Sequence, residues 1–333
     1  MSDAGPKGAP ERTPDTTTPH PAVPDRRPFL RRFGEYQAER FPFLQHGPLI
    51  LAFTFSAASY SRIVRGGDGF IPASDFIVGA LTTLSLFLLL RIADEFKDAA
   101  EDARFRPYRP VPRGLVTLRE LATLGAAVVL LLLALNLATM PRMIPLWLVP
   151  LGYMVLMTRE FFLRDWLKRH PIAYMLSHMM VLPMIDVYTT GLDWHNAAVS
   201  PPGGLEYFLL VTFLNGMVIE IGRKIRAPEA EEEGVETYSA LYGARRATII
   251  WLLVLLLTCG SAVAAAMHAG YGAVGLAILA GVLLLCGLPA LRFLRTGAQR
   301  DAHRIELAAG IWTIAMYLAL GGIPMVVKLI GKG

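Results

Sequence analysis

Cysteine and charged residues are scarce in this chain of 333 residues. It contains two cysteines, and 18% of its residues are charged whereas 54% are hydrophobic. Cys259 and Cys286 both lie inside apolar runs, which excludes a disulfide framework or a cysteine-based metal site and indicates two small core residues. So low a charge also excludes an ordinary soluble domain, and most of the chain is expected to lie in lipid.

A signal peptide is not apparent either. Residues 1–28 contain proline, threonine, aspartate and arginine but no apolar central stretch before a cleavage site. We expect residues 1–40 to form a disordered cytoplasmic tail and residues 41–333 to form one polytopic membrane domain.

Long apolar runs fill the rest of the sequence, whose mean hydropathy is +0.45. A hydrocarbon core of about 30 Å needs roughly 20 apolar residues per helical span. The sequence therefore predicts an all-α membrane protein with about nine transmembrane helices. The predicted spans are residues 44–64, 74–96, 117–139, 143–162, 171–191, 204–223, 246–267, 270–291 and 305–329.

Basic residues give the chain a net charge of +5, but their placement indicates membrane topology rather than nucleic-acid binding. When the loops are assigned alternately to two sides, one side carries most of the lysines and arginines. By the positive-inside rule that side is cytoplasmic. We thus expect a multi-pass protein of the cell (inner) membrane, with its N-terminus cytoplasmic and its C-terminus outside. The large polar loops 97–116 and 224–245 are then cytoplasmic, and a polar active site opens toward the cytoplasm.

An acidic cluster ends the second predicted span. Asp94, Asp98 and Asp102 are spaced by four residues, and Glu95 precedes Asp98 by three, so on a continuing helix their carboxylates line one side. Close carboxylates repel one another unless a cation lies between them, and hard oxygen ligands of this kind suit Mg²⁺ shared with a phosphate-bearing substrate. A solvated acidic helix end is the alternative. The continuation from an intramembrane helix and the arginines that follow favour the metal site.

The acidic cluster and the stretch after it resemble a known family. Glu95-x-x-Asp98-x-x-x-Asp102, followed by the run from Arg106 to Gly114, is similar to the first aspartate motif and the Arg-Pro-x-Pro-x-Gly stretch of the UbiA superfamily of intramembrane prenyltransferases. That family's motif begins Asn-Asp where this chain has Asp94-Glu95. The resemblance covers roughly residues 40–330.

This resemblance implies a bundle of about nine helices around a central cavity and a prenyltransferase activity. The enzyme would transfer an isoprenyl group from an allylic polyprenyl diphosphate to a lipophilic, often aromatic, acceptor. Mg²⁺ would assist ionisation of the diphosphate. The further partners would be membrane lipids, and no nucleic acid is expected. The implied metal ligands are Asp94, Glu95, Asp98 and Asp102. The implied catalytic carboxylates are Asp98, Asp102 and Glu220, and the implied diphosphate-binding residues are Arg109, Arg113, Arg159, Arg223 and Lys224.

The family's second acidic motif is altered in this chain. Its usual Asp-x-x-x-Asp is represented only by Glu220-x-x-x-Lys224, although Gly234-Val235-Glu236-Thr237 resembles the end of the motif. A protonated lysine cannot ligate Mg²⁺. Either Lys224 and its basic neighbours contact the diphosphate directly, or glutamates between 229 and 233 fold back as metal ligands; a solvated loop is the alternative for that glutamate run.

Other functions remain open at this point. A terpene cyclase of the UbiA type would capture the allylic cation with a double bond of its own chain, and a non-catalytic protein would bind or transport a lipid diphosphate. Four polar residues within the spans, Arg62, His178, Asp186 and Asn215, are either structural contacts or part of an acceptor site, and Arg62 and Asp186 could pair. Prenyl chain length, acceptor identity and oligomeric state do not follow from the sequence.

Overall fold

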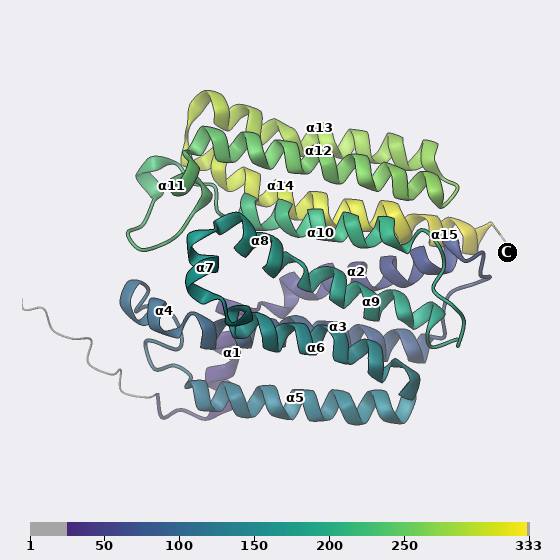
Figure 1. Cartoon of the computed structure of the whole chain (residues 1–333), viewed down its shortest axis with the longest axis horizontal. Coiled ribbons are helices and arrows are strands. Elements are labelled where there is room, and N and C mark those ends of the chain that lie inside the picture. Colours follow the sequence, from purple (N-terminus) through teal and green to yellow (C-terminus); the bar gives the residue numbers. More distant parts are fainter. Residues whose placement is uncertain (1–24, 332–333) are drawn as a thin grey trace, which may run out of the picture.

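The computed structural model describes residues 25–331, and these residues form helices and no strands (Figure 1). The longer helices are α2 (Phe43–Val64), α3 (Ala73–Lys97), α5 (Leu118–Thr139), α6 (Ile144–Thr158), α9 (Val181–Trp194), α10 (Leu205–Gly222), α12 (Ala244–His268), α13 (Gly272–Thr296) and α14 (Gln299–Tyr317). The shorter helices are α1 (Phe29–Arg40), α4 (Ala99–Phe105), α7 (Arg164–Arg169), α8 (Pro171–Met179), α11 (Tyr238–Tyr242) and α15 (Ile323–Ile330). The prediction of an all-α membrane fold is confirmed.

Seven segments of the described chain are long and apolar enough to cross a membrane. They are Ala73–Lys97, Leu118–Thr139, Pro171–Trp194, Leu205–Gly222, Ala244–His268, Gly272–Thr296 and Gln299–Ile330. The other two predicted spans correspond to α2, which has 22 residues, and α6, which has 15 and is shorter than the roughly 20 residues of a full crossing. Each of the nine predicted spans therefore coincides with helical structure. Seven of the segments in the described chain are long and apolar enough to cross a membrane.

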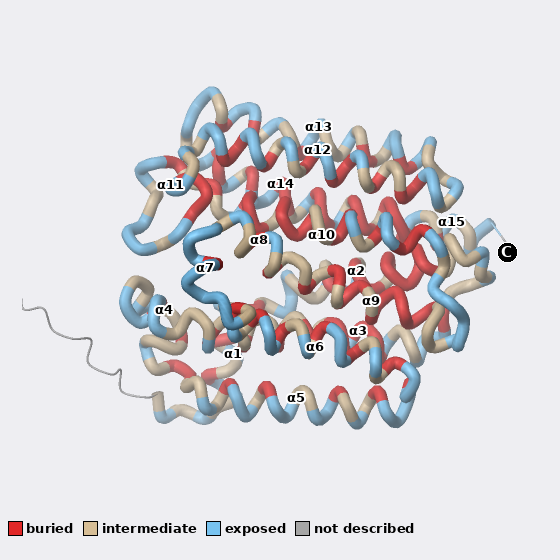
Figure 2. Tube along the Cα trace, in the orientation of Figure 1, coloured by how far each residue is buried: buried red, intermediate tan, exposed pale blue. Residues whose placement is uncertain are grey.

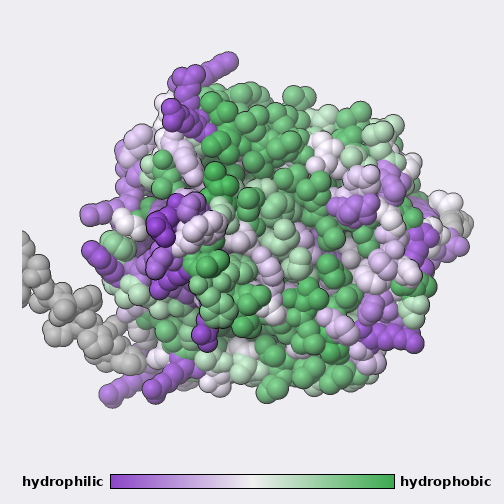
Figure 3. Space-filling model, viewed as in Figure 1, coloured by the Kyte–Doolittle hydropathy of each residue, from purple (hydrophilic) through white to green (hydrophobic). Residues whose placement is uncertain are grey.

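The long helices lie side by side along one direction, with polar side chains gathered at both ends and a broad apolar band between them (Figures 1 and 3). Buried residues concentrate on α2, α9, α10 and α14 (Figure 2). Helices α5 and α13 lie at the periphery, where Leu130, Leu131 and Leu284 are at least 65% exposed. Exposed leucines in such numbers are unfavourable in water but suit a surface that faces lipid.

Two long segments are interrupted where the sequence disfavours a regular helix. The segment Pro171–Trp194 is divided at Met180, three residues before Pro183, because proline removes a backbone hydrogen-bond donor and clashes with the preceding turn. The last segment passes from α14 through a π-helical turn, Leu318–Gly322, into α15. This turn packs closely on α2, since a Cβ atom at Gly321 would collide with the backbone of Ser56.

Helices α1, α4, α7 and α11 gather at one end of the bundle (Figure 1). Helix α1 differs from the expected disordered tail, most of which lies outside the described residues. It is held because Tyr36 is fully buried against the bundle and Arg32 forms an ion pair of 2.5 Å with Glu120, the residue that also completes the capping box of α5. Residues 29–40 are thus part of the folded domain.

At the opposite end, a buried carboxylate ties α9 to α2. Asp193 is 1% exposed and accepts hydrogen bonds from Ser61 Oγ at 2.9 Å and from Arg65 Nη2 at 2.6 Å, and Arg62 Nη1 lies 3.2 Å from it. Arg62 therefore pairs with Asp193 and not with Asp186, the partner that the sequence left open. The connections at this end include residues 65–72, between α2 and α3, and residues 195–204, between α9 and α10.

Candidate active site

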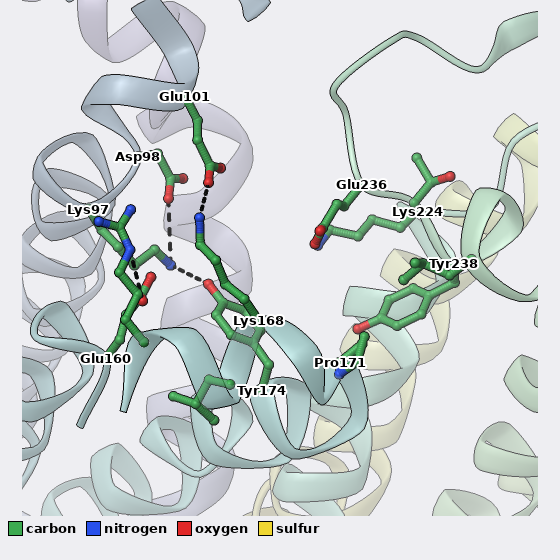
Figure 4. Close-up of a pocket in the computed structure, with 14 residues that line it drawn as sticks. Lys97, Asp98, Glu101, Glu160, Lys168, Pro171, Tyr174, Lys224, Glu236 and Tyr238 are labelled. Atoms are coloured by element: carbon green, nitrogen blue, oxygen red, sulfur yellow. Dashed lines mark hydrogen bonds and ion pairs between the residues drawn. The ribbon is translucent and has the colours of Figure 1, made fainter. Parts of the chain in front are cut away.

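A cleft of about 80 Å³ opens among the elements of the polar end that holds α4, α7 and α11 (Figure 4). Three segments supply its walls: the junction of α3 and α4, the stretch from the end of α6 to α8, and the stretch from the end of α10 to α11. The residues that line it are Lys97, Asp98, Glu101, Glu160, Arg164, Leu167, Lys168, Pro171, Tyr174, Lys224, Glu236, Thr237, Tyr238 and Leu241. Eight of the fourteen are charged, four of each sign.

Asp98 lies at the junction itself, where it ends α3 and begins α4. Its side chain is 29% exposed, and its closest ion-pair contact is Lys97 Nζ at 3.9 Å. Asp94, one turn earlier, is 33% exposed and lies 3.4 Å from the same ammonium group. Burial raises the pKa of the Asp98 carboxyl above its ordinary value of 3.8. Both carboxylates thus have a cation nearby but no close hydrogen-bond donor.

Glu95 and Asp102 have close partners instead. Glu95 is 2% exposed and faces α1, where Arg40 Nε donates to it at 2.6 Å, and Arg91 Nη2 lies at 3.2 Å. Asp102 is 1% exposed and accepts hydrogen bonds from Arg106 at 2.8 Å and Arg109 at 2.6 Å. The four acidic residues therefore do not share one open face: two are in ion pairs that hold α1 and the 99–116 segment, and two remain accessible.

Mg²⁺ fits the accessible pair. Within residues 25–331, no three histidine, cysteine, aspartate or glutamate side chains are grouped so that they alone could hold a metal ion. Magnesium, however, is often bound by one or two carboxylates together with substrate phosphates and water. Asp94 and Asp98 fit that role, because their present contacts to Lys97 are long, whereas Glu95 and Asp102 do not, because arginines occupy their oxygens.

The altered second motif contributes a cation to the cleft. Lys224 Nζ lies 2.9 Å from Glu220, one turn earlier on α10, and 5.6 Å from the centre of the Tyr238 ring. Glu220 also pairs with Arg223, whose side chain is 52% exposed and lines a neighbouring cleft with Arg226, Glu232, His303 and Glu306, among others. Burial raises the pKa of the Tyr238 hydroxyl, so that it stays protonated at neutral pH. Lys224 is thus placed by one carboxylate and one aromatic ring.

The remaining predicted diphosphate-binding arginines lie away from the cleft lining. Arg109 pairs with Asp102, and Arg113 donates to Glu39 at 2.6 Å and to the Tyr108 carbonyl at 2.8 Å. Arg159 is exposed and is not among the lining residues, while its neighbour Glu160 is. In the glutamate run, Glu231 accepts from Thr237 and Glu232 from Arg226. Of the glutamates between 229 and 236, only Glu236, which lies beyond that run, lines the cleft.

Sequence reasoning missed several residues that line the cleft, chiefly Lys97, Glu160, Arg164 and Tyr174. Lys97 stands inside the acidic motif itself and donates to the Tyr174 hydroxyl at 2.9 Å, so its position within the motif was an available signal. Arg164 and Lys168 have the composition of ordinary positive-inside residues, which hides any second role. Glu160 and Tyr174 carry no sequence signal, because the fold alone brings them to the cleft that Asp98 also lines.

Comparisons with known proteins identify the family and the fold. A family model described as the UbiA prenyltransferase family matches residues 51–325. A solved structure of digeranylgeranylglyceryl phosphate synthase is 14% identical, covers 91% of this chain and 99% of its own, and superposes with a TM-score of 0.60. The apo structure of a UbiA homologue from Aeropyrum pernix K1 is 18% identical, covers 85% of this chain and 98% of its own, and has a TM-score of 0.62. At these identities the two structures support the fold, and no curated protein matches the chain.

Proposed function

This chain belongs to the UbiA prenyltransferase family, and on that premise we propose that it transfers an isoprenyl group from an allylic prenyl diphosphate to a lipophilic acceptor at the cleft beside Asp98. It is a multi-pass membrane protein. The observation that carries the proposal is the pair Asp94 and Asp98, which are partly exposed and have no close hydrogen-bond donor, next to a cleft lined by Lys97, Arg164 and Lys224.

In the proposed complex, Asp94 and Asp98 hold Mg²⁺ together with the diphosphate. When bound, the metal neutralises charge that develops on the leaving diphosphate. Lys97 and Lys224 reach phosphate oxygens from two walls of the cleft, because both line it and both carry ammonium groups that form several hydrogen bonds. Arg223, the residue before Lys224, pairs with Glu220 and lines the neighbouring cleft.

Prenyl transfer then proceeds by ionisation. The bond between the allylic carbon and the diphosphate oxygen breaks, and its electron pair leaves with the diphosphate. The positive side chains of the cleft stabilise that negative charge. The apolar helices beyond the cleft shield the allylic cation from water until the acceptor attacks the same carbon and releases a proton. Glu95, Asp102, Arg109 and Arg113 support this site by fixing α1 and the 99–116 segment.

We place the cleft at the cytoplasmic side of the cell membrane. The basis is the distribution of lysine and arginine, which favours the end with α4, α7 and α11. The test uses a chain in which Cys259 and Cys286 are replaced by alanine. Single cysteines are placed at Ser74, an exposed residue in the first turn of α3 at the end opposite the cleft, and at Ala240, an exposed residue of α11. The two should react with a membrane-impermeant maleimide from opposite sides. Labelling of Ser74→Cys in inverted vesicles but not in intact cells would contradict this orientation.

The activity is tested by product analysis. Purified protein in lipid nanodiscs is incubated with Mg²⁺ and a panel of labelled prenyl diphosphates, with and without candidate acceptors, and diphosphate release and lipid products are measured. We expect Mg²⁺-dependent release of diphosphate, and Asp98→Asn should remove it. The control is Asp165→Asn, which changes an exposed acid of α7 outside the cleft and should preserve the release. A hydrocarbon product formed without acceptor would instead favour cyclisation, and absence of release from the intact protein with every donor would contradict catalysis.

A further inference from the structure

The wall of the cleft formed by α10 and α11 presents cations, and its buried carboxylate is already paired. Both oxygens of Glu220 are in ion pairs, because Lys224 Nζ lies 2.9 Å from Oε1 and Arg223 pairs with Oε2. The other acid of this wall, Glu236, is exposed to solvent. A phosphate group at this wall therefore meets charged and polar donors of the protein itself.

Tyr238 is fixed to this wall by its backbone. The loop that follows α10 returns at Tyr238, whose N–H group donates to the Lys224 carbonyl at 3.1 Å. The hydroxyl of the next residue, Ser239, accepts a hydrogen bond from the Arg226 N–H at 2.8 Å. These bonds hold the Tyr238 ring with its centre 5.6 Å from the Lys224 ammonium group. The two side chains are thus positioned as one unit.

The Tyr238 hydroxyl is a donor that lacks an acceptor in the protein. Tyr238 is 8% exposed yet lines the cleft, and its hydroxyl is turned toward the side of Pro171 and Tyr174 (Figure 4). No residue within the described range 25–331 forms a hydrogen bond with this hydroxyl. Burial raises its pKa, so it carries its proton at neutral pH. The Tyr174 hydroxyl differs, because it already accepts a hydrogen bond from Lys97 at 2.9 Å.

We propose that Lys224 and Tyr238 form a phosphate subsite that works without a metal ion, in which both side chains donate to oxygens of the same phosphate group. The inference rests on the proposed function, since this phosphate belongs to the prenyl diphosphate. The other phosphate group then lies at the wall with Asp94 and Asp98. The two walls are near each other, since Arg223 and Asp94 interact electrostatically. Hydrogen bonds to the leaving diphosphate strengthen as its negative charge develops, so Tyr238 also favours ionisation.

The test measures diphosphate binding with the metal removed. Full-length protein in nanodiscs is titrated calorimetrically with inorganic diphosphate, once in EDTA and once with Mg²⁺. We expect the parent protein to bind diphosphate in EDTA. Tyr238→Phe should weaken that binding by about 10-fold or more, the loss expected for a hydrogen bond to a charged group. The matched control is Tyr242→Phe, which removes a hydroxyl one turn later on α11, outside the cleft lining, and should bind as the parent protein does.

A second pair of variants separates a phosphate ligand from a residue that only positions Lys224. Tyr238→Phe keeps the ring beside the ammonium group, and it should fold normally because the hydroxyl has no partner to lose. Tyr238→Leu removes the ring and the hydroxyl together. If Tyr238→Phe binds diphosphate as the parent does and Tyr238→Leu does not, Tyr238 acts only through Lys224 and the assignment is wrong.

A double variant tests whether the two side chains bind one phosphate. Tyr238→Phe combined with Lys224→Met should lose less binding free energy than the sum of the two single losses, because either loss already displaces the shared phosphate. Losses that simply add would mean that the two groups act at separate places, which contradicts a common subsite.

The two titrations also distinguish this inference from the function on which it rests. Asp98→Asn should lower the binding that Mg²⁺ adds but should not weaken binding in EDTA, because a carboxylate repels an anion. If the parent protein binds diphosphate only in the presence of Mg²⁺ and Tyr238→Phe binds equally well, the metal-free subsite is wrong and the proposed function stands. If the parent protein binds diphosphate under neither condition, both proposals fail.

Discussion

The two ends of the helix bundle use similar charged residues in different ways. At the end opposite the cleft, Asp193 is almost fully buried and has three close partners from α2 and its C-cap, at distances of 2.6–3.2 Å. At the other end, Asp98 is partly exposed, and its closest cation lies 3.9 Å away. A carboxylate whose oxygens are fully bonded holds helices together, whereas one whose bonds are incomplete is free to bind a ligand.

The same contrast divides the acidic motif itself. Glu95 and Asp102 are as well paired as Asp193: Glu95 joins α1 to α3 through Arg40, and Asp102 holds the 99–116 segment together through Arg106 and Arg109. Asp94 and Asp98, which belong to the same run of sequence, have only distant cations: Lys97 lies 3.4 Å and 3.9 Å from them, and Arg91 lies 3.8 Å from Asp94. Pairing within the motif thus separates structural carboxylates from candidate ligands, and the predictions below test whether that separation holds.

The largest effect is expected at the structural end. Asp193→Ala should lower the free energy of unfolding by about 3–5 kcal/mol, because it leaves Arg62 and Arg65 without their buried partner. The measurement is the denaturant midpoint in mixed micelles, with Asp75→Asn, at the start of α3, as a less buried control. A change below about 1 kcal/mol would mean that this ion-pair cluster does not hold α9 to α2.

At the cleft end, Asp98→Asn should act on catalysis instead. We expect diphosphate release to fall by roughly 10²–10³-fold, the loss seen when one preorganised electrostatic group is removed from an active site. The unfolding free energy should change little, since the Asp98 carboxylate has no close bond to lose. The comparison between the two ends fails if Asp98→Asn unfolds the protein or Asp193→Ala selectively removes activity.

Lys224 tests the altered wall of the cleft. Lys224→Met keeps the length of the side chain but removes its charge and should weaken diphosphate binding by about 10-fold, as expected for one charged hydrogen bond. Lys224→Arg should restore most of the affinity. Isothermal titration with inorganic diphosphate and Mg²⁺ gives both values, and unchanged affinity in Lys224→Met would place the diphosphate elsewhere.

The raised pKa of Asp98 predicts a pH dependence with two opposite signs. Because the folded protein holds the Asp98 proton more tightly than the unfolded chain does, the contribution of this group to the unfolding free energy decreases as pH rises above 3.8 toward the folded value. Metal binding needs the ionised carboxylate. Below the pKa of Asp98 in the folded protein, Mg²⁺ affinity should therefore fall by up to about tenfold per pH unit. Titration of Mn²⁺ affinity between pH 4 and 7 measures the second effect, and an affinity that stays constant over this range would contradict it.

The sequence predicts the bundle well because membrane helices are dictated by long apolar runs. Each predicted span coincides with a helix or a pair of helices, and even the break before Pro183 has a local cause. The acidic motif and the Arg-Pro stretch indicate the family for the same reason: their residues are close in sequence. The structure adds the extent of α1, whose order depends on distant partners such as Glu120.

The composition of the cleft could not be predicted in the same way. Glu95 directly follows Asp94 in the sequence, so the two look like equivalent candidate ligands. Only the packing of α1 shows that the Glu95 carboxylate is paired with Arg40. Glu160 enters the cleft through a left-handed turn that no glycine announces. Tyr174 and Tyr238, from helices far apart in sequence, come together with Lys97 and Lys224 only in the folded bundle. Residues chosen by tertiary packing leave no periodic signal.

The smallest effect is expected at the exposed edge of the cleft, where Glu101 and Lys168 form a pair that is close but nearly half exposed. The hydrogen bond from Lys168 lowers the pKa of Glu101 below its ordinary value of 4.5, so its stabilisation is present above that pH and is lost as pH falls toward the lowered value. Solvent screens such a pair, and Lys168→Gln should cost no more than about 0.2–1 kcal/mol of unfolding free energy at pH 7. The midpoint of denaturant unfolding at low and high salt measures it. If a short distance alone decided the strength of an ion pair, the effect on the unfolding free energy would equal that at Asp193. A loss of several kcal/mol of unfolding free energy in Lys168→Gln would therefore show that burial does not explain the difference between the two ends.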